Sequence, residues 1–167
     1  RKLRNDAEKH GITFKDLQVD FGKMIGRSRG IADKLQKGIG SLFQKYQVKH
    51  EMGVGSIVGP HKVRYTGKDG AAKEVTADHV IIAVGARSTP LPGAAFDGQR
   101  VITSREAMTL AKQPKRMAVI GAGAIGCEFA DFYNAVGTEV VLVEMLEHIL
   151  PNEEDDVARV LKGVFEK

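Results

Sequence analysis

The clearest pattern of apolar and polar positions is a strand, a helix and a second strand within residues 117–144. Short apolar runs at 117–120 and 140–143 predict the two strands. Between them, apolar residues recur at spacings of four, three and four, which predicts a helix with one packing face. This stripe consists of Ile125, Phe129, Phe132 and Val136. Gly137 follows where a left-handed helix cap is expected.

A long helix is predicted over residues 20–47, where apolar side chains again recur every three or four positions. Five glycines interrupt it, and each disfavours a helix by about 1 kcal/mol relative to Ala. Three of them, Gly22, Gly26 and Gly30, are spaced four residues apart. This ladder predicts that another backbone or a ligand approaches the helix closely.

Short strands and turns are expected between residues 48 and 85. The predicted strands cover 48–52, 62–66 and 75–84, and the last one ends in an apolar run typical of a strand covered on both faces. We expect Gly53-Val54-Gly55 to form a turn or bulge and Lys68-Asp69-Gly70 to form a hairpin turn.

The last third of the chain begins with a linker, which prolines and a glycine mark at 90–93. Thr103 to Glu106 fits a capping box that opens a short helix through Leu110. The acidic run 153–156 is expected to begin a last helix, since acids are favourable in a first helical turn. The apolar residues of that helix are Val157, Val160, Leu161 and Val164.

A glycine-rich turn joins the strand at 117–120 to its helix, with the sequence Gly121-Ala122-Gly123-Ala124-Ile125-Gly126. In this G-x-G-x-x-G pattern the first glycine permits a sharp turn, the second lets a pyrophosphate come close, and the third lets the helix lie near the strand. The helix N-terminus offers unpaired N–H groups and a partial positive charge to the anion. The pattern therefore predicts a dinucleotide site, and a glycine-rich corner without a ligand is the alternative.

Glu144 ends the second strand eighteen residues after Gly126, close to the position of the acid that holds the adenosine ribose. A carboxylate repels a 2′-phosphate, and residues 145–147 contain no Arg or Lys to attract one. We therefore predict NAD rather than NADP.

Charge and cysteine content exclude several classes of site. Residues 1–50 contain twelve Lys or Arg and five Asp or Glu, net +7, whereas the remainder contains thirteen and sixteen, net −3. A basic segment occurs in nucleic-acid-binding proteins, but charges spread among apolar positions favour a solvated helix face. Cys127 is the only cysteine and the five histidines show no metal-ligand spacing, so no disulfide or metal site is predicted within this sequence. No apolar run approaches the roughly 20 residues that span a bilayer.

Taken in order, these segments resemble the flavin- and NAD-linked disulfide reductases, with the dihydrolipoamide dehydrogenases as the most similar branch. The matching pieces are the long helix ending in Gly38-Ile39 and Leu42-Phe43, the turn at 53–55, the strand end at 83–86, Thr103-Ser104, and residues 119–128. The resemblance implies an α/β, Rossmann-like FAD/NAD(P)-binding fold with an inserted antiparallel β-meander, truncated at both ends. Residues 1–91 would then be the rear part of the FAD-binding domain, and 92–167 a linker and the first part of the NAD-binding domain.

The resemblance also implies which residues contact the cofactors FAD and NAD. Gly55 and the segment Val84-Gly85-Ala86 are expected beside FAD. Glu144 is expected on the adenosine ribose of NAD, and Glu128 near the nicotinamide, although an acid placed favourably in a first helical turn is the other explanation for Glu128. The remaining residues expected along NAD are Gly121, Ala122, Gly123, Ala124, Ile125, Gly126 and Cys127.

The family's upstream FAD fingerprint, its redox cysteine pair and its catalytic His-Glu pair have no match here, so no catalytic residue is predicted. The resemblance implies that the parent oxidises protein-bound dihydrolipoamide and passes electrons via FAD to NAD. It implies a homodimer within 2-oxoacid dehydrogenase complexes, with a lipoyl domain as substrate. We expect this piece to bind nucleotides and to be inactive by itself.

Three alternatives remain: another NADH-linked reductase or oxidase of the family, a stand-alone NAD-binding module, and nucleic-acid binding through the basic first third. Our prediction is that neither nucleic acid nor a membrane is a partner. A single cysteine and no secretion signal predict a reducing interior, either the cytoplasm of a bacterium or the mitochondrial matrix.

Overall fold

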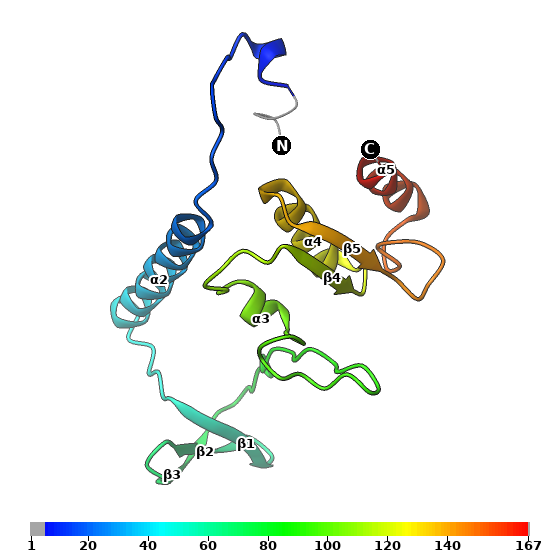
Figure 1. The fold of residues 1–167 in the computed structure, drawn as a ribbon. Coiled ribbons are helices and arrows are strands. Elements are labelled where there is room, and N and C mark those ends of the chain that lie inside the picture. Colours follow the sequence, from blue (N-terminus) through cyan, green and yellow to red (C-terminus); the bar gives the residue numbers. More distant parts are fainter. Residues whose placement is uncertain (1–5, 167) are drawn as a thin grey trace. The chain divides into compact units, whose positions relative to one another are not determined.

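The structure is a computed structural model that describes residues 6–166 of the chain (Figure 1). Packing divides these residues into two compact units. One unit consists of the residues up to Arg29 together with those from Pro90 on, and the other covers Gly30–Thr89. The predicted boundary between the FAD-binding part (residues 1–91) and the linker with the NAD-binding part (residues 92–167) stays a prediction. Within the described residues, no helix is both long and apolar enough to cross a membrane.

The predicted long helix is confirmed as α2 (Phe21–Lys45), which follows a 3-10 turn, η1 (Glu8–His10), and an extended segment. It begins where the Asp20 carboxylate accepts a hydrogen bond from the Lys23 backbone N–H, at 2.9 Å. Among the described residues, no atom lies within 4 Å of the position that a Cβ would take at Gly26 or Gly30. The close approach that the glycine ladder suggested therefore stays a prediction.

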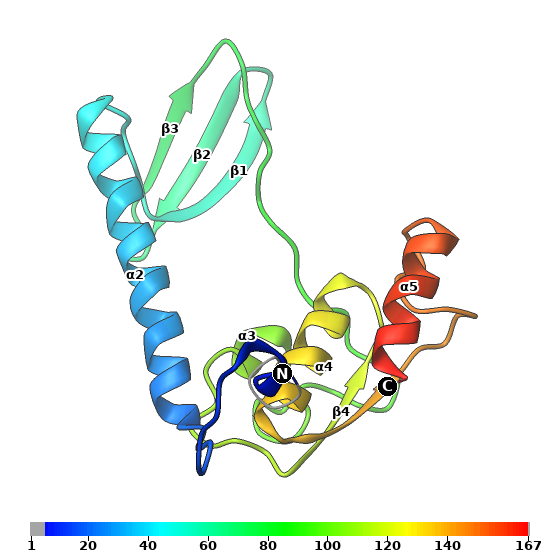
Figure 2. The same ribbon diagram turned by 90° about the horizontal axis from the view of Figure 1, so that it is seen from above.

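Three antiparallel strands follow α2 and form a sheet in the order β1-β2-β3, as Figure 2 shows. The strands are β1 (Gly53–Gly59), β2 (Lys62–Gly67) and β3 (Ala72–Thr76). The turn between the last two contains Gly70 at a φ of 79°, as predicted for the Asp-Gly hairpin. This sheet is the expected meander.

Two predictions for the segment that leads into this sheet and for its first strand are wrong. Residues 48–52 form no strand, because this segment closes the helix: Gln47 has a φ of 55° and the Val48 N–H donates to the carbonyl of Phe43 at 2.8 Å. Residues 53–55 are the first residues of β1 rather than a turn. Gly53 pairs with Gly67, and a Cβ on Gly53 would meet the carbonyl oxygen of Thr66. The glycine therefore permits close strand pairing.

The strand predicted over 75–84 is also wrong beyond Thr76, since residues 77–90 have no regular structure. Ile81 and Val84 are 90% and 89% exposed. A strand of this apolar kind is stable when neighbouring strands pair with it and both faces are covered. Among the described residues none pairs with this run.

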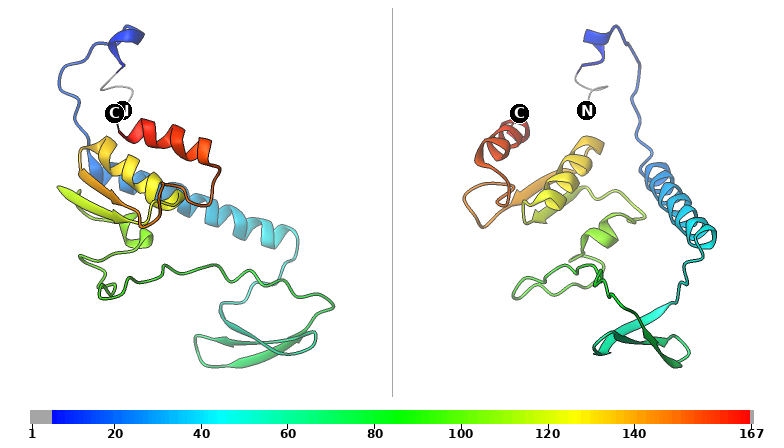
Figure 3. Two further views of the ribbon diagram at one scale, coloured as in Figure 1. Left: turned by 90° about the vertical axis from the view of Figure 1, so that its right-hand side faces the viewer. Right: turned by 180° about the vertical axis from the view of Figure 1, so that it is seen from behind.

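The other unit contains the predicted strand, helix and strand as β4 (Arg116–Ile120), α4 (Ala124–Val136) and β5 (Glu139–Val143). The two strands pair in parallel, with Ile120 opposite Val143, and α4 packs against both of them (Figure 3). Gly137 caps the helix with a φ of 103°, as predicted.

The core of this unit forms where the start of α2, α3 (Ser104–Ala107) and α4 meet. Phe21 and Tyr133 are buried there, and the Tyr133 hydroxyl donates to the carbonyl of Ala107 at 2.6 Å. The predicted capping box is present, since the Glu106 carboxylate accepts from both the N–H and the hydroxyl of Thr103. Helix α3 is shorter than predicted and ends at Ala107.

The packing faces of the last two helices match the predicted stripes only in part. On α4, Val136 is buried and Phe129 and Phe132 pack against the core, as predicted, whereas Ile125 is 61% exposed. The other buried residues of this helix are Cys127, Ala130 and Tyr133. The last helix, α5 (Asp155–Phe165), begins near the acidic run as predicted, but it buries Ala158 and exposes Val157, Val160 and Val164. The stripe of large apolar side chains therefore identified most of the packing face of α4, but not the buried residue of α5.

Candidate dinucleotide-binding site

The candidate site lies where β4 ends and α4 begins. Gly121 has a φ of 97°, a left-handed conformation that favours glycine. Its N–H donates to the carbonyl of Val143 at 2.8 Å, which ties the end of β4 to the end of β5. The chain thus turns sharply out of the strand, as the first glycine of the pattern predicted.

The glycines of the turn face different surroundings. A Cβ on Gly126 would meet the carbonyl oxygen of Gly121 and lie 3.5 Å from Cγ1 of Val119, so only glycine allows the helix this close to the strand. A Cβ on Gly121 or Gly123 would meet no described atom within 4 Å. The loop is therefore closely packed against the protein at Gly126 and open at Gly123, where a pyrophosphate is expected.

The N-terminus of α4 has no side-chain cap, because the capping residue is Gly123. The first N–H bonded inside the helix is that of Cys127, which donates to the carbonyl of Gly123 at 3.0 Å. The N–H groups before it have no carbonyl one turn earlier in the helix to bond to. Together with the positive end of the helix dipole, these groups can bind an anion.

Glu144 reaches back to this loop from the end of β5. One carboxylate oxygen accepts from the Ala122 N–H at 2.7 Å, and the other accepts from the N–H groups of Met145 at 2.8 Å and Leu146 at 3.0 Å. The bonds from Leu146, Ala122 and Met145 hold the pKa of Glu144 below its usual value. Glu144 is therefore ionised at neutral pH, and the structure brings it together with the glycine-rich turn at Gly121–Gly126. The sequence carried no signal for the bond to Ala122, which depends on the pairing of β4 with β5.

Ala122 lies completely buried beneath the loop. Its carbonyl accepts from the Leu150 N–H at 2.7 Å and from the Cys127 thiol at 3.3 Å. Burial, followed by the nearby charge of Glu144, raises the pKa of Cys127. Since the Cys127 side chain is 4% exposed, a nucleotide contact at this residue would be through its backbone.

Three further predicted NAD residues, Ala124, Ile125 and Glu128, lie exposed on the first turns of α4. Glu128 is the fifth residue of the helix and lies past its first turn. The alternative explanation for Glu128, an acid stabilised in the first turn, is therefore wrong, because the dipole effect falls off within that turn. Its expected role near the nicotinamide stays a prediction.

The residues expected beside FAD lie in the other unit. Gly55 is in β1 opposite Tyr65, and Val84, Gly85 and Ala86 lie in the irregular segment after β3. All four are exposed, and Gly85 has a φ of 72°. Their contacts with FAD stay predictions.

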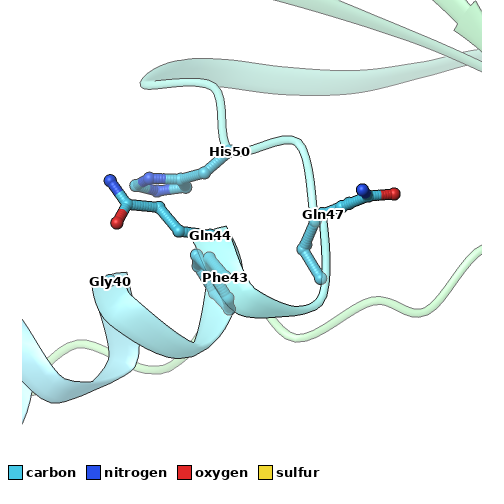
Figure 4. Close-up of a pocket in the computed structure, with 6 residues that line it drawn as sticks. Gly40, Phe43, Gln44, Gln47 and His50 are labelled. Carbon is cyan, nitrogen blue, oxygen red and sulfur yellow. The ribbon is translucent and has the colours of Figure 1, made fainter.

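The same unit has a hollow at the carboxyl end of α2, with a volume of about 450 Å³ (Figure 4). The rings of Phe43 and His50 lie there with their centroids 5.4 Å apart, and Gln44 lies beside His50. His50 is the only ionisable side chain among the residues that line it, which are Gly40, Phe43, Gln44, Gln47, Val48 and His50. No Lys or Arg side chain is therefore among the residues that line the hollow.

No group of three or more His, Cys, Asp or Glu side chains between residues 6 and 166 could hold a metal ion. The arrangement at the β4–α4 turn, in contrast, has the open glycine backbone, the uncapped helix end and the ionised acid that a dinucleotide requires.

The sequence matches the pyridine nucleotide-disulphide oxidoreductase family over residues 3–167. The chain belongs to this family. The family uses FAD and NAD(H), so the two predicted cofactors are confirmed at the level of the family.

Similar curated proteins include the dihydrolipoyl dehydrogenases of Chlorobaculum tepidum and Chlorobaculum parvum, which are 38% and 36% identical to the chain over 165 residues. Each match covers 99% of the chain and 35% of the relative. Leghemoglobin reductase of Glycine max is 33% identical over 158 residues, which are 95% of the chain and 30% of that protein. The chain therefore spans about a third of the length of these relatives.

A similar solved structure is the crystal structure of LpdA from Mycobacterium tuberculosis, with a TM-score of 0.85 and 30% identity. The match covers 99% of the chain and 36% of LpdA. Together with the family match, it confirms the predicted FAD/NAD(P)-binding fold class and the resemblance to dihydrolipoamide dehydrogenases.

Proposed function

We propose that this chain is part of a dihydrolipoyl dehydrogenase and supplies the NAD-binding turn of that enzyme. The observation that carries the proposal is the loop at Gly121–Gly126, which is open at Gly123, closely packed at Gly126 and linked to an ionised Glu144. Such a loop binds a pyrophosphate at the helix end and a ribose at the acid. The similarity to dihydrolipoyl dehydrogenases over nearly the whole chain supports the same assignment.

Within this proposal, the backbone from Gly121 to Gly126 binds the pyrophosphate of NAD and Glu144 accepts hydrogen bonds from the adenosine ribose. Glu128 orients the nicotinamide, and Gly55 with the segment 84–86 lies beside FAD. When bound, the two cofactors supply hydride and electron transfer between dihydrolipoamide and NAD. The residues of this chain bind and orient them.

The whole enzyme is proposed to oxidise protein-bound dihydrolipoamide as a homodimer in 2-oxoacid dehydrogenase complexes, in the bacterial cytoplasm or the mitochondrial matrix. Thiol exchange at a disulfide needs two cysteines, and this sequence has one. We therefore expect the 167-residue chain alone to show no dihydrolipoamide oxidation above background in an NAD-coupled assay. Turnover above background would contradict this expectation.

The binding role is tested by calorimetric titration of the chain with NADH and with NADPH. We expect saturable binding of NADH, and weaker binding of NADPH because Glu144 repels the 2′-phosphate. Equal affinity for both nucleotides would contradict the role of Glu144, and no binding of either would contradict the proposed function. Titration with FAD in parallel tests whether flavin binds independently.

A further inference from the structure

The peptide bond between Gly121 and Ala122 is held from both sides. The N–H and C=O groups of a trans peptide point in opposite directions. Here the N–H of Ala122 donates to Glu144 at 2.7 Å. The carbonyl oxygen of Gly121 lies against Gly126, so close that a Cβ there would meet it. The plane of this peptide is therefore fixed by the acid on one side and by the helix on the other.

The next peptide bond, between Ala122 and Gly123, is fixed through its carbonyl. That oxygen accepts from the Leu150 N–H at 2.7 Å and from the Cys127 thiol at 3.3 Å. The N–H of Gly123 belongs to the same peptide and points the opposite way. It therefore points away from the buried side of the loop, and the surroundings of Gly123 are open.

The bonds that Glu144 makes differ in reach. Those from Met145 and Leu146 are local, one and two residues along the chain. The bond from Ala122 joins residues twenty-two positions apart and links the end of β5 to the loop. A shorter acid keeps the local bonds, since Asp makes such turns readily, but it is one methylene too short to reach Ala122 as well.

We propose that Glu144 is a positioning residue for the diphosphate-binding loop: its bond to the Ala122 N–H orients the backbone so that the N–H groups at the start of α4 face the phosphate. This proposal rests on the proposed function and adds a second role to an acid expected to bind ribose. The loop is set in place before any nucleotide arrives, and loss of the bond weakens phosphate binding even when no adenosine is present.

The test compares NADH with reduced nicotinamide mononucleotide, which carries a phosphate but lacks the adenosine and its ribose. The variant is Glu144→Asp, which keeps the negative charge. The matched control is Glu147→Asp, an exposed acid with no hydrogen bond or ion pair among the described residues. We expect Glu144→Asp to weaken binding of both nucleotides, by about tenfold for a lost charge-assisted hydrogen bond. We expect the control to leave both affinities unchanged.

If Glu144→Asp weakens NADH but leaves the mononucleotide unchanged, the acid acts on the ribose alone and the positioning role is overturned, while the proposed function stands. Unchanged affinity for both nucleotides also overturns it.

Amide hydrogen exchange gives an answer that needs no ligand. We expect the Ala122 N–H to exchange slowly in the wild type and at least about tenfold faster in Glu144→Asp, with an unchanged unfolding midpoint. Unchanged exchange at Ala122 overturns the proposal, whether or not the wild type binds a nucleotide. A wild type that binds neither nucleotide would separately contradict the proposed function.

Discussion

At the scale of single residues, the shape of the loop depends on the absence of a side chain at Gly126 as well as on the hydrogen bonds around the loop. Gly126 has no Cβ, and this lets the carbonyl of Gly121 lie against the helix. The residue types of the fingerprint were predictable from sequence, because each glycine has its own steric reason. The bonds from Ala122 to Glu144 and from Leu150 to Ala122 were not predictable, because they join segments that only the folded chain brings together.

Gly126→Ala tests this packing. The added methyl group would meet the Gly121 carbonyl, so the helix must move away from the strand. We expect the affinity for NADH, measured by calorimetry, to fall by about tenfold or more, as for a misplaced anion site. Gly163→Ala in α5 is the matched control, since no described atom lies within 4 Å of its Cβ position. If Gly126→Ala binds NADH as the wild type does, the close packing has no role in binding.

The reactivity of Cys127 tests the buried side of the loop. Burial and then the charge of Glu144 raise the pKa of this thiol, so at a given pH less of it is the reactive thiolate than in an exposed cysteine. We expect iodoacetamide to modify it slowly in the native protein at pH 8 and rapidly in denaturant, as followed by mass spectrometry. Equally fast modification in both conditions would show that the thiol is accessible.

At the scale of elements, the helices and strands whose sequence signals lie entirely within the element were predicted well. Helix α2, helix α4 with its glycine cap, and strands β4 and β5 follow from spacing and turn residues within the element itself. The run at 80–84 was predicted as a strand from its apolar residues, but a strand exists only where partners bond to it. Strand β1 was missed, and its first residues were predicted as a turn because Gly53, which permits close pairing with β2, resembles a turn glycine.

Helix α4 is joined to α3 through the buried Tyr133 hydroxyl, which donates to the carbonyl of Ala107. Tyr133→Phe leaves that carbonyl without its donor, and we expect the free energy of unfolding to fall by about 1–3 kcal/mol. Denaturant unfolding followed by circular dichroism measures this change. The control is Tyr46→Phe, which removes an exposed hydroxyl and keeps the ring. Equal stability of the two variants would mean that the Tyr133 bond contributes nothing.

At the scale of the whole molecule, the chain contains two separately packed units. The turn proposed to bind NAD lies within one of them, whereas the residues expected beside FAD lie exposed in the other. Family membership was predictable because several segments, each of low specificity alone, occur in an order that is specific to the family. We therefore predict that NADH binding needs only the unit that contains β4, α4 and β5.

The most direct test of that central claim is an NMR titration of the ¹⁵N-labelled chain with NADH, in which the amide shifts identify the residues that respond. We predict saturable shifts concentrated in residues 121–128 and 144–146, with the sheet β1-β2-β3 unaffected. Shifts that occur mainly outside the β4–α4 turn, or no saturable shift at all, would contradict the account.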